Sequence, residues 1–137
     1  MNRRDFQRLA KMRLEEAKVL LDARKPSGAY YLAGYSVECG LKSCIAKQVR
    51  RHQFPDRQTV NQSYKHDLDL LVGVAGLRDE LAQEMKRDAD FEKNWLVVKD
   101  WSEQSRYSIT AQREARDMLE AVMDPQHGVM QWIMRNS

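Results

Sequence analysis

The segment from Gly28 to His52 restricts the possible folds of this chain more than any other feature. Its sequence, GAYYLAGYSVECGLKSCIAKQVRRH, has apolar residues at helical spacing and is apolar on most sides of the helix. A helix of this kind lies in the middle of a bundle or in a dimer seam, so we expect it to be central. Gly34 and Gly40 each cost about 1 kcal/mol relative to Ala in a helix, and we expect them to admit the backbone of another helix.

Amphipathic patterns before this segment, and a polar stretch after it, set the next elements. Apolar residues from Phe6 onward keep to one helix face for about 20 residues, and RKPSG ends that helix because Pro26 has no amide hydrogen. Ser27 is then expected to cap the central helix. Residues 50–66 are polar and contain Pro55, which predicts a long loop.

The second half of the chain contains shorter helical patterns. HDLDLLVGVAGL starts a third helix that Gly76 ends, and a fourth helix follows, which residues 88–90 can break. SEQSRYS predicts a turn, and AQREARDMLEAVM predicts a fifth helix. Asp124 and Pro125 match an N-cap followed by Pro at the first helical position, so we expect a last helix to begin there.

No segment shows the alternation of a β-strand. We therefore predict an all-α fold: one domain over residues 1–137, an up-and-down bundle of four to five main helices with a long loop after the second helix. Cys39 and Cys44 lie about 140° apart around the central helix, so we expect two buried thiols that share neither a disulfide nor a metal.

Charge is distributed unevenly along the chain. Residues 1–65 carry 14 Lys and Arg against 6 Asp and Glu, whereas residues 66–105 carry 5 against 10. A basic first half can face phosphate, although charged helix surfaces alone produce such a pattern too. No apolar run approaches the roughly 18 residues of a membrane span, and the charged N-terminal segment does not match a signal peptide. We therefore expect a cytoplasmic protein without a membrane segment.

Three short sequences together resemble the HEPN (higher eukaryote and prokaryote nucleotide-binding) domain family. They are AYYLAGYSVECGLKSCI, HDLDLL and DWSEQSRY, in this order, within a stretch from about Leu14 to Val122. The resemblance implies a bundle of four or five helices that usually forms a homodimer. It also implies a place beside a small nucleotidyltransferase in prokaryotic toxin–antitoxin or defence modules, where many members cleave RNA without a metal and others only bind nucleotides.

The ribonucleases of that family carry an Arg that is followed, after four to six residues, by a His. The matching residue here is Arg106, and no His follows it in that window. The usual ribonuclease signature is therefore absent, while the resemblance in fold is unaffected.

Glu38 and Lys42 place an acid and an amine inside the most apolar segment of the chain. They are spaced i, i+4 and share a helix face with Tyr31 and Tyr35. One interpretation is a partly buried ion pair that fixes the helix register or a dimer seam. The other is a polar pocket in which Lys42 reaches a phosphate. The sequence thus gives four candidate binding residues: Glu38, Lys42, Tyr31 and Tyr107.

His66 and Arg106 are the catalytic candidates. An imidazole can transfer a proton near neutral pH, and a guanidinium can hold a phosphate through two parallel hydrogen bonds. If both meet in one cleft, His66 takes the 2′-hydroxyl proton of RNA and Arg106 stabilises the phosphorane. The structural alternatives are a His66 ring bonded to the loop, an Arg106 that closes a helix end or pairs with Asp67, Asp69 or Asp100, and a Tyr107 ring in the core.

Metal and cofactor chemistry has little support. His52, His66 and His127 lack the spacing of metal ligands, and there is no Gly-rich phosphate loop, so we expect neither a metal nor a cofactor. Trp132 is a candidate dimer contact.

The leading functional hypothesis is a nucleotide- or RNA-binding interaction module of a prokaryotic toxin–antitoxin or defence system, a homodimer that acts with a nucleotidyltransferase-type partner. One alternative is a metal-independent ribonuclease toxin that uses Arg106 and His66. Another is a purely structural bundle that regulates a partner through protein contacts.

Overall fold

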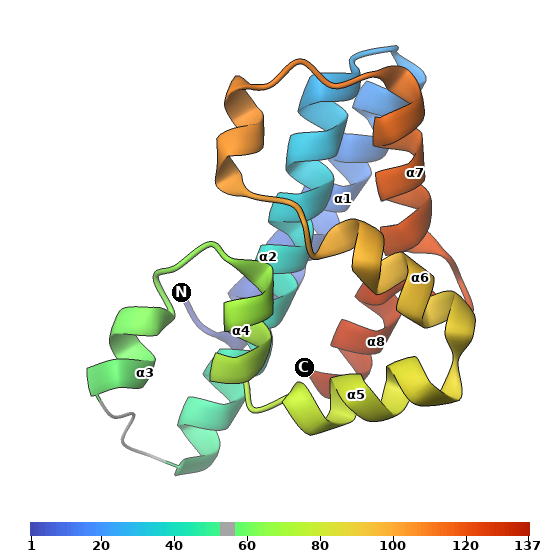
Figure 1. Ribbon diagram of the computed structural model, residues 1–137. Helices are drawn as coiled ribbons and strands as arrows, with labels where there is room; N and C mark the ends of the chain where they lie inside the picture. Colours follow the sequence, from blue (N-terminus) through green and yellow to red (C-terminus); the bar gives the residue numbers. More distant parts are fainter. Residues whose placement is uncertain (53–56) are drawn as a thin grey trace.

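The computed structural model describes residues 1–52 and 57–137, apart from the side chains of residues 51 and 52. The described residues form helices and no strand, which confirms the all-α prediction (Figure 1). The α-helices are α1 (Arg3–Asp22), α2 (Pro26–His52), α3 (Arg57–Gln62), α4 (Leu68–Val74), α5 (Arg78–Arg87), α6 (Ala89–Val98), α7 (Gln112–Met123) and α8 (Val129–Asn136). A 3-10 helix, η1 (Glu103–Tyr107), precedes α7.

Helix α2 is the centre of the structure, as its apolar sequence predicts. Helix α1 lies along one side of it, and α4, α7, α8 and η1 contact its other sides (Figure 1). Val37, Leu41 and Ile45 of α2 are buried in the core. Glu38, by contrast with the exposed Lys47 and Arg50, is buried inside this helix, so its partners decide whether it is structural or functional.

The two glycines of α2 make room for side chains. A Cβ atom on Gly34 would lie 2.2 Å from the indole ring of Trp101, and one on Gly40 would lie 2.9 Å from Cγ2 of Ile133 in α8. Gly34 therefore makes room for a side chain and not for a helix, whereas Gly40 lies against helix α8 with Ile133 as its nearest neighbour.

The start of α2 also differs from the prediction. Pro26 is the first residue of the helix, where its fixed φ fits and its missing amide hydrogen costs nothing. Ser27 lies inside the helix, and its hydroxyl oxygen accepts a hydrogen bond from the amide of Thr110 at 2.9 Å. Ser27 therefore ties the start of α7 to α2 and does not cap α2.

The predicted long loop after α2 contains a helix. Residues 57–62 form α3, and residues 53–56 of that loop lie outside the described residues. The loop prediction is wrong for α3, because the polar sequence RQTVNQ forms a short helix that ends at Gln62. The hydroxyl of the next residue, Ser63, donates a hydrogen bond to the carbonyl of Val60.

The break expected near residues 88–90 is present. Asp88 separates α5 from α6, and its Oδ1 accepts hydrogen bonds from the amides of Asp90 and Phe91 at 3.0 and 3.1 Å. Trp95 and Trp101 are both buried, as expected for anchors.

The last helix begins later than predicted. Asp124 caps a turn, because its Oδ1 accepts from the amides of Gln126 and His127, and α8 starts only after Gly128. Trp132 on α8 is buried against Phe91, with ring centroids 5.5 Å apart. The hypothesis that Trp132 contacts a second copy is therefore wrong, because this side chain belongs to the core.

Candidate functional site

Glu38 is a buried carboxylate in the middle of α2. Only 2% of the residue is exposed. Its Oε2 accepts a hydrogen bond from Nζ of Lys42 at 3.1 Å, and its Oε1 lies 3.0 Å from Nδ1 of His66. The predicted Glu38–Lys42 ion pair is confirmed, and the structure adds His66 as a second partner.

His66 connects three elements. It precedes Asp67, which caps α4 by accepting a hydrogen bond from the amide of Leu70. Its Nδ1 faces Glu38 of α2, and its Nε2 lies 3.2 Å from Oε2 of Glu103 in η1. We call Lys42, Glu38, His66 and Glu103 the Glu38 network. The alternative that the His66 ring bonds its own loop is wrong, because both ring nitrogens face carboxylates of other elements.

The polar groups of the Glu38 network contact one another, but two of its side chains also reach solvent. The side chain of Lys42 is 15% exposed and that of His66 is 41% exposed, so the network runs from the core to the surface. Proton transfer between His66 and a substrate requires Glu103 to move from Nε2. Lys42 uses one of its three N–H groups on Glu38 and can offer the others to a ligand.

An aromatic group lies on the same face of α2. The ring of Tyr31 is stacked on Tyr35 at a centroid distance of 6.2 Å and packs against Trp101 at 5.9 Å. Burial, followed by the neighbouring Cys39 and Glu38, raises the pKa of Tyr35. Tyr31 thus packs between Tyr35 and Trp101.

Arg106 and Tyr107 lie together at the surface. The guanidinium carbon of Arg106 is 5.1 Å from the ring centroid of Tyr107. Tyr107 is 74% exposed, so the alternative that it belongs to the core is wrong. In the described part of the chain Arg106 forms no ion pair, and the alternative of an Asp partner finds no support; Asp69 pairs with Arg78 at 3.6 Å.

The structure does not bring Arg106 into contact with His66. The link between them is Glu103, which contacts His66 and lies three residues before Arg106 in η1. Residues three apart in a 3-10 helix share a face, so Arg106 and the outer end of the Glu38 network occupy the same side of η1.

A basic groove that the sequence did not single out lies between the start of α1 and the end of α2. We call it the arginine groove; its volume is about 700 Å³ and its lining consists of Asn2, Arg3, Arg4, Gln7, Ala46, Val49 and Arg50. Arg3 is partly committed, because its Nη2 donates to the main-chain oxygen of Ser137 at 2.8 Å. Arg4 and Arg50 are exposed, and neither has an ion-pair partner among the described residues.

An apolar pocket adjoins the arginine groove. Its volume is about 330 Å³, and its lining consists of Met1, Phe6, Lys42, Ile45, Ala46, Val49, Thr59, Val60, Ser63 and Tyr64. Ala46 and Val49 line both hollows, so the two are neighbours on one face of α2. Lys42 therefore does line a pocket, as one interpretation of the sequence held, but the pocket is mainly apolar. Sequence reasoning missed Val60 and Tyr64 as lining residues of this pocket because it assigned residues 50–66 to a loop.

The two cysteines are free and buried, as predicted. Burial raises the pKa of Cys39 and that of Cys44 to about 11. Both thiols are therefore protonated near neutral pH, and neither is suited to act as a nucleophile.

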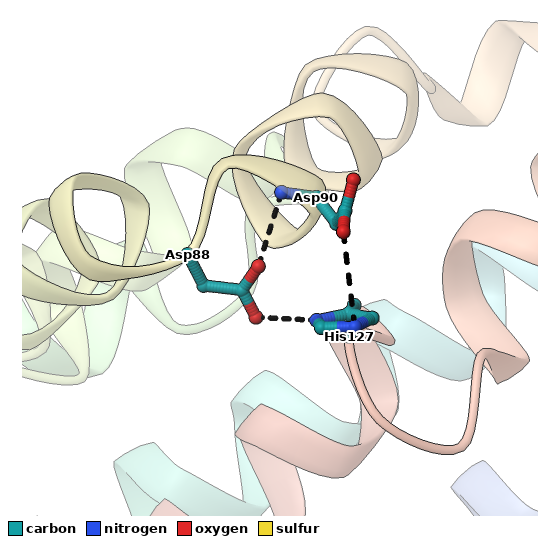
Figure 2. A group of neighbouring side chains, drawn as sticks. All are labelled: Asp88, Asp90 and His127. Carbon is teal, nitrogen blue, oxygen red and sulfur yellow. Dashed lines mark hydrogen bonds and ion pairs between the residues drawn. The ribbon is translucent and has the colours of Figure 1, made fainter.

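A second histidine–carboxylate cluster lies where the α7–α8 turn meets the start of α6. Figure 2 shows His127 between Asp88 and Asp90: Nδ1 is 2.6 Å from Oδ2 of Asp88, and Nε2 is 3.8 Å from Oδ2 of Asp90. The amide group of Asn94 donates to the main-chain oxygen of His127 at 2.9 Å. Sequence reasoning missed this cluster because its members are 39 residues apart.

The hydrogen bonds of this cluster join the α7–α8 turn to the start of α6. The hydrogen bond from His127 lowers the pKa of Asp88, and the same bond raises the pKa of His127. Ligand atoms of Asp88, Asp90 and His127 lie within 4.8 Å of one another, which is close enough for a cation. However, both carboxylate oxygens of Asp88 already accept hydrogen bonds, and the positive end of α6 opposes a cation there.

Among the helices that the structure describes, none combines the length and the apolar character of a membrane span.

Comparison with protein-family models, with curated proteins and with solved structures finds no match to this chain.

Proposed function

We propose that this protein is a nucleotide- or RNA-binding interaction module that holds phosphate groups in the arginine groove. The observation that carries the proposal is the lining of that groove: it contains three arginines and no carboxylate. The sequence resemblance to HEPN domains supports the same class of ligand.

The chemistry of the groove suits phosphate. Arginine binds phosphate oxygens through two parallel N–H groups, and Arg4 and Arg50 are exposed. The start of α1 adds partial positive charge from its helix dipole. The acid nearest in sequence, Asp5, is turned onto the amide of Asn2 in a capping box, so its carboxylate is already engaged.

Lys42 places a hydrogen-bond donor at the edge of the apolar pocket. Its ammonium group lies against Glu38, and that carboxylate is itself held by His66. The network therefore fixes the position of an amine at the edge of the pocket, where it can meet a polar atom of a bound nucleotide.

Affinity measurements test this proposal. The binding of a fluorescein-labelled single-stranded RNA, and separately of ATP, is measured by anisotropy for the wild type and for Arg4→Gln/Arg50→Gln. A lost charge-assisted hydrogen bond is worth about 1.5–3 kcal/mol, so we expect binding about 10- to 150-fold weaker for each arginine removed.

The matched control removes the same charge elsewhere. Arg113 and Arg116 are exposed on α7, away from the lining of the groove. Arg113→Gln/Arg116→Gln should bind RNA within about twofold of the wild type, because neither side chain lines the groove and salt screens exposed charges that touch no phosphate. Equal losses in the two double variants, or no binding by the wild type, contradict the proposal.

A homodimer that works with a nucleotidyltransferase-type partner, in a prokaryotic toxin–antitoxin or defence system in the cytoplasm, is part of the same proposal. It is supported by the resemblance and by exposed apolar side chains at the end of η1 and just after it, where Tyr107 is 74% and Ile109 100% exposed. Light scattering after size exclusion should give a dimer mass, and Tyr107→Ser/Ile109→Ser should lower it to a monomer mass. A monomeric wild type rules out this part.

A metal-independent ribonuclease is the second candidate. The observation in its favour is that Glu38 orients the His66 ring while η1 carries Arg106 on the side of that ring's outer nitrogen. Incubation of mixed RNA with the wild type, His66→Ala and Arg106→Ala in the presence of EDTA tests it. Cleavage by the wild type alone supports the candidate, and equal behaviour of the three proteins excludes it.

A further inference from the structure

The apolar pocket has the shape and lining of a site for a small flat group. Its volume of about 330 Å³ is near the lower end of the roughly 300–1,000 Å³ of ligand pockets. The side chains of Phe6, Ile45 and Val60 supply apolar walls. Tyr64 lies at the rim, and 73% of it is exposed, so one ring face is available to a ligand.

The polar groups of the pocket are few. Lys42 stands at one side with its ammonium bonded to Glu38, and the Ser63 hydroxyl donates to the carbonyl of Val60 at 2.7 Å. A ligand held here gains more from stacking and burial than from hydrogen bonds. Lys42 still has N–H groups that can donate to a carbonyl oxygen or a ring nitrogen.

The arginine groove beside the apolar pocket restricts the kind of ligand that can occupy both. Ala46 and Val49 form a shared wall, and Arg50 follows Val49 directly, so the basic and the apolar hollow meet along one turn of α2. A ligand that fits both must carry a flat, apolar-faced ring beside an anionic group. Nucleotides have this combination, with the base attached through ribose to the phosphate.

We propose that the apolar pocket receives an unpaired base of single-stranded RNA, stacked on Tyr64, while the adjoining phosphates lie on Arg4 and Arg50. This inference rests on the proposed function and adds a base subsite to it. Stacking on an aromatic ring tolerates every base, and the pocket offers few groups that distinguish one base from another, so the preference among bases is weak.

The same subsite excludes duplex RNA. Bases in an A-form duplex are stacked and paired, and they cannot turn into a side pocket without loss of those contacts. Duplex RNA therefore reaches only the arginines and binds more weakly per strand than the unpaired form.

The experiment compares three probes of equal length and label. They are a single-stranded RNA, its duplex, and an abasic ribose-phosphate oligomer that keeps the charge and lacks the bases. Anisotropy is measured for the wild type, Tyr64→Ala, Tyr64→Phe and Arg4→Gln/Arg50→Gln, with the fold of each checked by circular dichroism. Tyr64 is exposed, so its substitution leaves the core intact.

We expect the wild type to prefer the single strand over both other probes by about tenfold, the value of one stacked base. Tyr64→Ala should lose that preference and keep the weaker binding of the duplex and the abasic oligomer. Tyr64→Phe, which keeps the ring, should behave as the wild type.

The outcomes separate this inference from the proposed function. If the wild type binds all three probes equally, or if Tyr64→Ala binds all three as the wild type does, the base subsite is wrong while a loss in Arg4→Gln/Arg50→Gln still supports the phosphate site. If the arginine variant also binds unchanged, the proposed function fails. If Tyr64→Ala alters the oligomeric mass and leaves RNA affinity unchanged, the pocket is a protein interface and the inference is overturned.

Discussion

Two histidine–carboxylate pairs of similar geometry lie in very different surroundings. His66 and His127 each place Nδ1 within 3.0 Å of a carboxylate, Glu38 in one case and Asp88 in the other. Glu38 is buried in an apolar helix and depends on His66 and Lys42 for its polar contacts. Asp88 caps α6 with a side chain that is 19% exposed, and the amides of Asp90 and Phe91 donate hydrogen bonds to it. Loss of the histidine partner should therefore lower the free energy of unfolding much more at Glu38 than at Asp88.

The two pairs also differ in what they connect. The Asp88–His127 pair joins the α7–α8 turn to the start of α6 and borders neither of the hollows described above. The Glu38 network reaches from the core to Lys42, which lines the apolar pocket. We therefore assign a structural role to the first pair and a positioning role to the second.

The largest expected effect comes from stranding Glu38. In Lys42→Met/His66→Leu the carboxylate stays buried without a partner, and the free energy of unfolding should fall by about 3–5 kcal/mol. Urea denaturation followed by circular dichroism measures this. Adding Glu38→Met to the double variant should recover most of the loss, because an apolar triad replaces a stranded charge. A triple variant as unstable as the double one contradicts the assignment.

Thiol labelling gives the next largest effect and reports on α2 itself. Cys39 follows Glu38 in the chain, and burial raises the pKa of its thiol to about 11, so labelling by a disulfide reagent at pH 8 should be slow in the native protein. Cys44→Ser is included in every protein so that only Cys39 is labelled. In Lys42→Met/His66→Leu local opening of α2 becomes easier, and the labelling rate of Cys39 should rise at least about tenfold. In His127→Gln the rate should not change. An equal rise in both variants removes the distinction between the two pairs.

The His127 pair should contribute less stability. His127→Gln keeps a side chain of similar size and removes the ion pair, so the melting temperature should drop by less than in the Glu38-network double variant. Differential scanning calorimetry at pH 6 compares the two drops. A larger drop for His127→Gln reverses the proposed order.

The smallest effect is the pH dependence of the His127 pair. The bond to Asp88 raises the pKa of His127 from 6.5, so its stabilisation is present below 6.5 and is lost as the pH rises through the higher folded value. The pKa of Asp88 is lowered from 3.8 by the same bond, so its stabilisation is present above 3.8 and is lost as the pH falls. The difference in unfolding free energy between the wild type and His127→Gln should therefore be largest between pH 3.8 and 6.5. A difference that grows above pH 8 contradicts this sign.

The sequence predicted contacts within a helix better than contacts between helices. The Glu38–Lys42 pair follows from spacing alone, because residues i and i+4 share a helix face. The partnership of Glu38 with His66 and of His66 with Glu103 depends on how α2, α4 and η1 pack, and spacing carries no information about that. The central position of α2 was predictable because a helix with so few polar residues has no stable place at the surface.

The errors at helix ends share one physical cause. Ser27 and Asp124 both have side chains that accept amide hydrogen bonds, and both do so in the structure, but for the start of α7 and for a turn. A side chain of the capping type predicts that an unpaired backbone amide lies nearby, but it does not predict which helix or turn that amide belongs to. The arginine groove escaped prediction because the charge count shows that the first half of the chain is basic but does not show which of its arginines share a surface.

The salt dependence of RNA binding tests the central claim most directly. Each phosphate contact to a single strand contributes a slope of about −0.7 to the plot of log affinity against log salt concentration. For Arg4→Gln/Arg50→Gln the slope should become less negative by about 1.4, and for Arg113→Gln/Arg116→Gln it should stay as in the wild type. Slopes that are the same in all three proteins would show that the groove between α1 and α2 does not hold the phosphates.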